Sequence, residues 1–349
     1  MDIYVMNRNF VILDIIDYSE SVIWTKRYAE AGDFEIVVPA NKRAMDLLIR
    51  ANFIARTDDD AIMVIKKVQL QTNVESGDKL IVSGPSIESC LAQRIVWAQT
   101  NLNGTVAQGI TKLLNDNAID PAEATRKLDR LTIGVLCTKS AQLSLTKQIT
   151  GDQLSDAISA ICKTYGLGYK ITLNDSKLIF DLYSGYDRSY SQTINPYVVF
   201  SEKFGNLLSS DYTYDKTNYK NVAMVAGEGE GIARKKSIVG IANGWDRYEI
   251  FVDQRNLSTN NGEISDIEYT KQLNESGNEK LTECQITESF ESNVDPTANY
   301  VYGKDYFLGD IVQIENAYGI QAKARITEVI ESEDESGHTY LPTFEVMEV

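Results

Sequence analysis

The sequence predicts an α+β protein that is mainly β, in which two β-rich units flank a mixed one. Apolar and polar residues alternate at strand spacing over residues 3–83 and again beyond residue 197, whereas the stretch between has helical spacing. At 349 residues the chain is long enough for two or three domains with separate apolar cores. We therefore expect a first β-barrel domain at 1–98, an α+β insertion domain at 99–195 and a second β-rich domain at 196–349.

The first domain is predicted to be an antiparallel meander that closes into a small barrel. The polar turns "TDDDA" and "ESGDK" separate its strands at short intervals. Ser86 can cap a short helix that ends the unit and places Cys90 in the core. The apolar residues expected to repeat on one face of the strands are Phe34, Ile36, Val38, Val68, Leu70 and Val74.

The middle domain is predicted to contain two helices and a hairpin. One apolar helical stripe begins at Val106; a second begins at Leu154, with Thr150 as its cap, and stops at Gly166. The segment "YKITLNDSKLIFDLY" has turn residues at 174–176, which is typical of a β-hairpin. We expect both stripes to pack in a core rather than to bind a partner.

The last domain returns to strand-like segments, among them "PYVVF", "NVAMVA" and "RYEIFVD", and later "DIVQI", "KARITEVI" and "TFEVMEV". Residues 264–284 between them have helical propensity, which we expect to break at Gly277 because glycine weakens a helix interior. A helical insertion near 264–284 is therefore predicted within this second β-rich domain.

Nearly all of the negative charge lies in the last third of the chain. The formal net charge is −16, and residues 251–349 hold 20 acidic and 6 basic side chains. Such a surface repels polyanions, so tight nucleic-acid binding is not expected. Two interpretations stay open: a well-solvated face, or an acidic wall, facing a lumen or an interface, past which a polyanion slides.

The residue types that most catalytic sites need are scarce. The chain has one histidine, His338, and four scattered cysteines. Because histidine is the commonest metal ligand and neutral-pH base, its near absence argues against most metallohydrolases and histidine triads. The cysteine spacing indicates neither a disulfide framework nor a zinc knuckle. We expect no metal and no cofactor, and neither a membrane span nor a secretory signal is visible.

The segment "GEGEGIARKK" at 227–236 raises the question of phosphate binding. A P-loop or a dinucleotide fingerprint needs other glycine spacing and a helix directly after it, whereas the residues after this G-x-G-x-G run are strand-like. The intervening Glu228 and Glu230 would also repel a phosphate. We expect a strand whose glycines mark a bulge or the close approach of another backbone, with the basic residues 234–236 exposed on the return strand.

Other catalytic arrangements are equally poor matches. Glu228 and Glu230 would share one face of a strand, whereas glycosidase carboxylates flank a substrate across a cleft. Residues 58–60 lack the spaced oxygens and the glycine of a calcium loop, so a polar hairpin tip is expected there. The sequence therefore predicts no catalytic residue and no enzyme.

Five segments, in this order, resemble the phage tail hub family, over nearly the whole chain. That family includes the N-terminal module of siphophage tail-associated proteins and the baseplate hubs of contractile tails and of phage-tail-like bacteriocins. The segments are "WTKRYAEAGDFEIVVP" (24–39), "VSGPSIESCLAQRIV" (82–96), "YKNVAMVAGEGEGIARKK" (219–236), "RYEIFVDQRNLS" (247–258) and "YGKDYFLGDIVQI" (302–314).

The resemblance implies two tube-protein-like barrels, so that the β-rich domain at 196–349 is a second β-barrel domain, and a homotrimer in which two barrels per subunit form a ring of six similar units. Such a ring docks on a hexameric tail tube or distal tail protein and presents threefold symmetry to a spike, fibre or tape-measure protein. It also implies a place at the tail tip or baseplate of a virion or phage-tail-like particle assembled in the host cytoplasm. In related sequences the glycine run lies in a barrel strand, where small residues let neighbours pack closely.

Two other classes of protein remain open. One is a β-rich receptor- or carbohydrate-binding module, for which the 19 tyrosines could supply exposed aromatic side chains in loops. The other is an enzyme that acts on the cell wall, which would need a catalytic pair that the sequence does not show. The C-terminal peptidase, hydrolase or receptor-binding extensions of longer family members are not expected in this chain.

Overall fold

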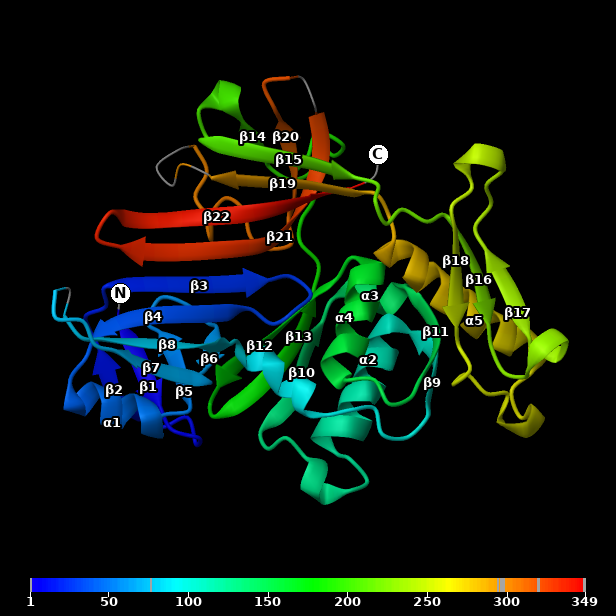
Figure 1. Ribbon diagram of the computed structural model, residues 1–349, viewed down its shortest axis with the longest axis horizontal. Coiled ribbons are helices and arrows are strands. Elements are labelled where there is room, and N and C mark those ends of the chain that lie inside the picture. The colour runs from blue at the N-terminus through cyan, green and yellow to red at the C-terminus, as the bar shows by residue number, and fades with distance from the viewer. Residues whose placement is uncertain (1, 76, 294, 296–298, 319–320, 348–349) are drawn as a thin grey trace.

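A computed structural model of the chain shows one long sheet built from both the first and the last part of the sequence (Figure 1). The structure describes residues 2–347 except 76, 294, 296–298 and 319–320. In spatial order the sheet runs β15 (Ser209–Asp215), β19 (Thr287–Asn293), β22 (Gly337–Val346), β21 (Gln321–Asp334), β3 (Ser21–Arg27), β4 (Asp33–Pro39), β8 (Lys79–Pro85) and β7 (Lys67–Gln71).

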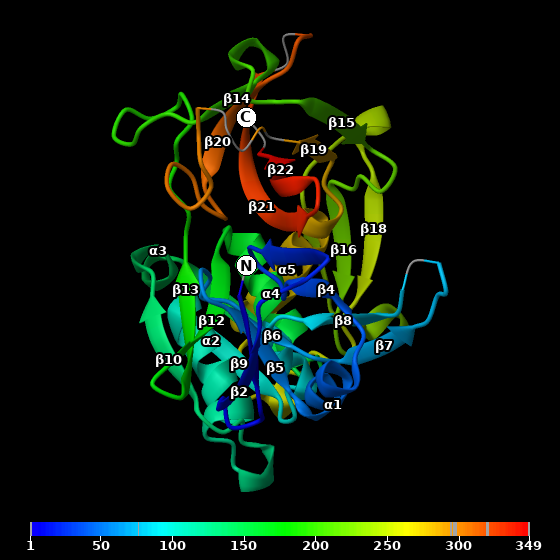
Figure 2. The same ribbon diagram turned by 90° about the vertical axis from the view of Figure 1, so that its left-hand side faces the viewer.

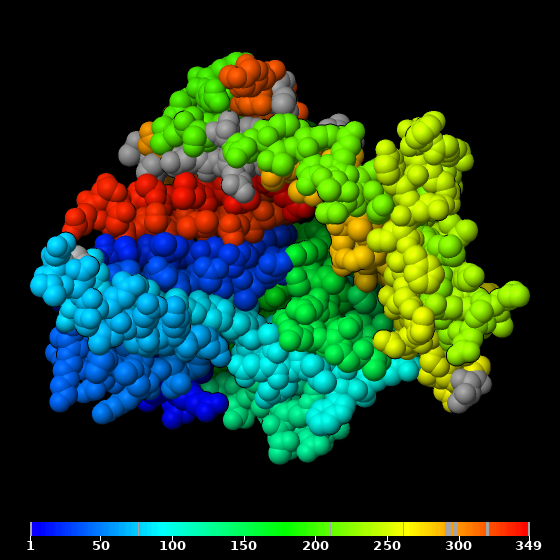
Figure 3. Space-filling model, in the orientation of Figure 1, coloured from blue at the N-terminus to red at the C-terminus, as the bar shows by residue number. Residues whose placement is uncertain are grey.

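The middle of this sheet is the pairing of β3 with β21. These strands run antiparallel in register from Ser21 opposite Asp334 to Arg27 opposite Glu328. Figure 3 shows the result as a red band of C-terminal strands lying directly against a blue band of N-terminal strands. The predicted domains 1–98 and 196–349 therefore share one backbone ladder, and the prediction of a mainly β protein is confirmed.

The first unit packs a second sheet and a helix against its half of the long sheet. Trp24, Phe34 and Ile36 are buried between the two sheets, as strand alternation predicts. Leu70 is exposed instead because β7 is an edge strand, and Val74 is exposed because it lies in the turn beyond the end of β7. Among the described strands, hydrogen bonding closes no barrel. The added elements are β1 (Ile3–Met6), β2 (Ile12–Ile16), β5 (Phe53–Arg56), β6 (Ile62–Val64) and α1 (Lys42–Arg50).

The middle unit has the predicted helices and hairpin. The hairpin turns at Asp175 and Ser176, both at positive φ, which suits a two-residue turn. Gly166 ends α4 in the left-handed conformation, whereas the cap at its start is Gln153 rather than Thr150. The elements are β9 (Thr100–Thr105), α2 (Val106–Leu114), β10 (Leu131–Leu136), α3 (Thr138–Gln142), β11 (Ser144–Ile149), α4 (Leu154–Tyr165), β12 (Gly168–Asn174) and β13 (Lys177–Tyr183).

The last unit curls its half of the long sheet around an aromatic core. β14 (Val199–Ser201) and β20 (Ile311–Glu315) extend the sheet from β21, so the order β14-β20-β21-β22-β19-β15 surrounds the core. Phe200 lies at its centre, with its ring centroid 5.2 Å from that of Tyr306 and 5.1 Å from that of Phe344. These aromatic rings pack together with aliphatic residues such as Leu207, Ile314 and Ile326 in one core. The pairing of the described strands leaves this unit open as well.

Residues 216–284 form a separate lobe, at the right of Figure 1. Its sheet contains the segments "NVAMVA" and "RYEIFVD", which the sequence placed in the second barrel. The helix α5 is continuous through Gly277, not broken there: a Cβ at this position would lie 2.7 Å from Val239 Cγ2 and 2.8 Å from Val225 Cγ2, so glycine permits the close helix–sheet contact. The lobe consists of β16 (Val222–Ala226), β17 (Lys236–Val239), β18 (Glu249–Asp253) and α5 (Asp266–Glu283).

Candidate assembly surfaces

The glycine run is a loop, not a strand. β16 ends at Ala226, and the loop closes on α5, where Tyr269 accepts a hydrogen bond from the Glu228 amide at 2.7 Å. A Cβ on Gly227 would lie 2.1 Å from the hydroxyl oxygen of Tyr269, so a side chain approaches this first glycine. A Cβ on Gly229 would lie 3.0 Å from the carbonyl oxygen of Ala233, so backbone approaches the second. Gly229 and Gly231 have positive φ, which explains glycine there.

The charged residues around this loop are used inside the lobe. Both carboxylate oxygens of Glu228 accept hydrogen bonds from Thr259. Arg234 is not exposed as predicted: it donates to the carbonyl oxygens of Ala226 and Gly227 and pairs with Asp253. The loop therefore serves to fasten the sheet to α5, and a 3₁₀ turn rather than an α-helix follows it.

The remaining residues considered for chemistry are dispersed. Cys90 and Cys162 are buried core residues, and burial raises the pKa of Cys90 to about 12. No group of three or more histidine, cysteine, aspartate or glutamate side chains is placed to hold a metal within the described ranges. In that same part of the chain, no helix has the length and apolarity needed to span a bilayer.

His338 contributes to a charged cluster that fastens the first unit to the last. Arg56 on β5 and Glu331 on β21 are each 4% exposed, and two hydrogen bonds of 2.5 and 2.7 Å join them. His338 Nε2 lies 2.7 Å from the same carboxylate, and Tyr340 donates to it. Burial by itself would raise the pKa of Glu331, but hydrogen bonds and positive charge from Arg56, aided by His338, lower it below its ordinary value.

The polar turn at 58–60 extends this junction. It is the tip of the β5–β6 hairpin, and each of its three aspartates has a cationic partner. Asp58 accepts two hydrogen bonds from Arg56, and Asp60 pairs with Lys170 of the middle unit at 2.7 Å. The partner of Asp59 is Lys26 of β3. This turn therefore links the first unit to the middle unit, and Arg56 carries the connection on to Glu331 of the last unit.

Among the described strands, the eight-stranded path of the long sheet ends at the edge strands β7 and β15, and its branch through β20 ends at β14. Following the register across the strands shows that Lys67 on β7 and Asp211 on β15 project from the same face of the sheet, opposite the two cores. The edge strands lie at opposite ends of the sheet, with β22, β21, β4, β8 and β7 following one another down the molecule in Figure 2. Unpaired edges of this kind are templates for pairing with another chain.

The outer face of the lobe carries an exposed apolar row across three strands. Met224 pairs in register with Ile238 on one side and Phe251 on the other, and these side chains are 42%, 65% and 55% exposed, respectively. The opposite face of the same strand packs on α5 with Val225 fully buried. The apolar run "NVAMVA" could have indicated such a two-sided apolar strand, but not which face stays uncovered. A contiguous exposed apolar row commonly marks an interface.

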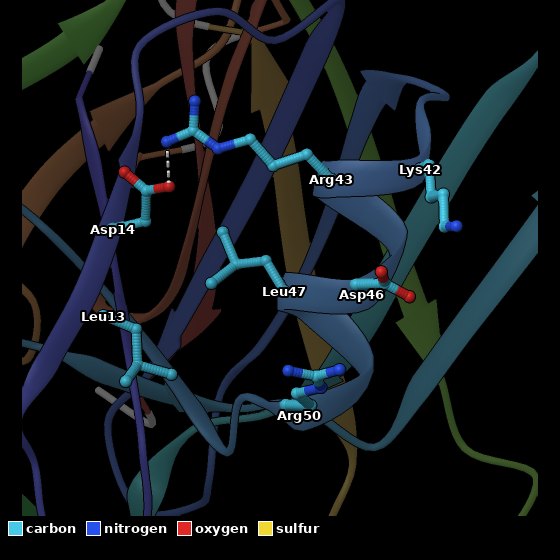
Figure 4. A pocket seen from close by; sticks show the side chains of 7 residues that line it. All are labelled: Leu13, Asp14, Lys42, Arg43, Asp46, Leu47 and Arg50. Atoms are coloured by element: carbon cyan, nitrogen blue, oxygen red, sulfur yellow. Dashed lines mark hydrogen bonds and ion pairs between the residues drawn. The ribbon is translucent and has the colours of Figure 1, made fainter.

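A shallow hollow lies between the edge strand β2 and helix α1 (Figure 4). Leu13 and Leu47 face it, and an ion pair between Arg43 and Asp14 spans its rim at 2.5 Å. The other lining residues, Lys42, Asp46 and Arg50, carry charged groups, and the hollow is open to solvent rather than enclosed. It lacks the convergent polar groups of a catalytic pocket.

The structure is similar to three solved tail proteins. The tail protein from Neisseria meningitidis MC58 matches with a TM-score of 0.59 and 13% identity, covering 99% of this chain and 95% of that one. The prophage tail protein gp18 from Listeria monocytogenes EGD-e gives 0.56 and 12%, with 99% and 94% covered. The 43 kDa tail protein of prophage MuSo2 from Shewanella oneidensis gives 0.58 and 10%, with 99% and 98% covered.

No curated protein sequence matches the chain. The family model described as Siphovirus ReqiPepy6 Gp37-like protein matches residues 2–344, nearly the whole length. The resemblance of the five sequence segments to a phage tail family is thereby confirmed. The chain belongs to the Siphovirus ReqiPepy6 Gp37-like protein family, a family of phage tail proteins.

Proposed function

We propose that this phage tail protein is a non-catalytic hub that forms a homotrimeric ring, caps the tail tube and adapts sixfold to threefold symmetry. The tube or a distal tail protein would dock on one side, and a spike, fibre or tape-measure protein on the other. The single observation that carries the proposal is the long sheet, in which four strands from the first unit and four from the last form one ladder. Two such halves per subunit supply six similar segments in a trimer.

The directions of the strands suit a closed ring. All seven neighbouring pairs along the eight-stranded path are antiparallel, so the free edges β7 and β15 run in opposite directions. If copies are related by a rotation axis, β7 of one copy therefore meets β15 of the next in the antiparallel sense. Each joint would satisfy backbone groups that are unpaired along both edges. Head-to-tail contacts of this kind generate rings.

The charges on the two edges also favour this joint. Lys67 on β7 and Asp211 on β15 are exposed and lie on the same face of the sheet, and Asp215 adds a second acidic group to β15. Opposite charges across an interface speed encounter and fix its register. The acidic last third of the chain would thus provide part of an interface, in line with one of the two sequence-based interpretations.

The test combines particle imaging with a charge exchange. The purified chain, alone and bound to tail tube, is expected to have the mass of a trimer and to appear as a three-subunit ring. Lys67→Glu and Asp211→Lys should each weaken the ring, and the double variant should restore it. Lys236→Glu, on the lobe strand β17, is the matched control, because Lys236 is exposed like Lys67 and lies outside the long sheet. Absence of the protein from tail particles, or rings unchanged by either single variant, would contradict the proposal.

A second candidate function is a receptor- or carbohydrate-binding module of the tail tip. It is favoured by the loop between β17 and β18, where Trp245 is 98% exposed and Tyr248 is 48% exposed. Exposed aromatic rings stack readily on ligands that are partly apolar. Glycan-array binding by the isolated protein, lost in Trp245→Ala, would support this module, whereas equal binding by the variant would remove the loop from consideration.

A further inference from the structure

Two cationic side chains meet where the three parts of the chain join. Arg325 on β21 is 9% exposed, and its guanidinium lies over the ring of Tyr28, 5.0 Å from the centroid. Lys139 on α3 reaches the same place from the middle unit. A Cβ on Gly166 would lie 3.3 Å from Lys139 Nζ and 3.4 Å from Arg325 Nη2, so both charged groups converge on one glycine.

The protein groups around these cations are neutral. Lys139 Nζ donates to the carbonyl oxygen of Gly166 at 3.1 Å, and Arg325 Nη1 donates to that of Gly309 at 2.7 Å and to the Tyr28 hydroxyl at 3.3 Å. Among the described residues, neither cation has a carboxylate oxygen within 4.0 Å. Glu345 stands opposite Arg325 in the β21–β22 register but is exposed and forms no ion pair with it.

The described residues at this junction supply too little negative charge to compensate Arg325 and Lys139. Helix α4 ends at Gly166 and directs its carbonyl groups here, but a helix terminus offers only about half an elementary charge against two cations. Burial and the neighbouring charge of Arg325 lower the pKa of Lys139. Buried charges in proteins are ordinarily compensated by a partner, because desolvation without one is costly. A counter-charge supplied from outside the chain would meet this need.

We propose that Arg325 and Lys139 form a binding site for a small oxyanion, a phosphate or a carboxylate. In the described structure the Arg325 Nε and Nη2 groups have no acceptor, and Lys139 has donors to spare beyond its one hydrogen bond. Arginine presents its donors in a planar fork that suits phosphate and carboxylate oxygens. Lys139 is half-buried, so an anion from solvent can reach the site on the side of this residue. The bound anion would hold the last and middle units together beside Tyr28 of the first.

The experiment measures thermal unfolding of the full-length protein at constant ionic strength, with inorganic phosphate or acetate replacing sodium chloride. A saturable rise in Tm is expected, because a ligand that binds the folded state stabilises it. Lys139→Gln and Arg325→Gln should each weaken apparent binding about tenfold or more, the loss expected for a charge-assisted hydrogen bond. Lys163→Gln removes the same charge from the same end of α4, outside the site, and should respond as the unaltered protein does.

A larger rise in Tm with phosphate would identify the ligand as a free phosphate-type anion, and a larger rise with acetate would identify it as a carboxylate. Either result supports the site. The proposal is overturned if neither anion raises Tm up to about 50 mM, a range in which linkage would reveal even weak binding. It is also overturned if both site variants respond as Lys163→Gln does. Should Arg325→Gln not fold, Lys139→Gln decides alone, since Lys139 makes only one hydrogen bond.

Discussion

The junction between the first and last units differs sharply from the outer face of the lobe formed by residues 216–284. At the junction, Arg56 and Glu331 are almost fully buried and paired, and β3 and β21 complete each other's hydrogen bonding. On the lobe, Met224, Ile238 and Phe251 form an apolar row open to solvent. The first surface is an interface already completed within one chain. The second has the composition of an interface whose partner is another molecule.

The largest effect is expected from breaking the junction. Arg56→Met leaves Glu331 buried without its main partner and should lower the free energy of unfolding by about 3–5 kcal/mol. Urea unfolding followed by circular dichroism measures the change. Arg43→Met removes a cation from an exposed pair and should cost less than about 1 kcal/mol. Similar losses of unfolding free energy in the two variants would show that the buried Arg56–Glu331 pair stabilises the protein no more than an exposed ion pair does.

The next largest effect is the difference in unfolding free energy between substitutions on the two faces of β16. Val225 is fully buried against α5, so Val225→Ala should cost about 2 kcal/mol through lost burial and a residual cavity. Met224→Ala on the outer face should change stability by no more than about 0.5 kcal/mol in the isolated protein. The same unfolding experiment compares them. A cost for Met224→Ala as large as that for Val225→Ala would mean that the outer face is already covered in solution.

Acid should weaken the junction before it affects the lobe's apolar packing. Because Arg56 and His338 lower the pKa of Glu331 below its ordinary value near 4.5, the stabilisation is present above that pH and is lost as the pH falls through the folded-state pKa. Unfolding free energies measured between pH 6 and 3 should therefore fall less steeply in Glu331→Gln than in the unaltered protein. Parallel curves for the two proteins would assign the acid sensitivity to other carboxylates.

The smallest effect on the monomer is expected from making the apolar row polar. Ile238 is 65% exposed, so Ile238→Ser should leave the unfolding free energy within about 0.5 kcal/mol. Its incorporation into tail particles should nevertheless decrease if the row is an interface, which quantitative immunoblotting of purified particles would measure. Normal incorporation would indicate that the row makes no contact in the particle.

Local sequence patterns predicted the elements well. Alternation identified Phe34, Ile36 and Val38 as core residues, and turn chemistry located the hairpin at 174–176. Gly166 ends its helix as predicted, because the residue that closes α4 is in the left-handed conformation, which glycine adopts readily. Each of these signals depends on residues within a few positions of one another. Secondary-structure propensity and apolar periodicity are determined over the same short range.

Long-range arrangement could not be predicted in the same way. The partners Arg56 and Glu331 are 275 residues apart, and nothing in either local segment indicates the other. "NVAMVA" forms a strand as the sequence predicts, but it joins the lobe's sheet rather than the long sheet, because apolar alternation does not specify a neighbour. Gly277 was expected to interrupt a helix, whereas tight packing against Val225 and Val239 overrides its low propensity.

The β3–β21 ladder also has a consequence for biosynthesis. β3 emerges from the ribosome well before its hydrogen-bonding neighbour β21, which is made only when residues 321–334 follow. During that interval the nascent polypeptide displays an open strand edge, a feature that favours aggregation and chaperone engagement. Ribosome-bound fragments that stop before residue 321 should therefore recruit holdases more strongly than fragments in which β21 has emerged and paired with β3.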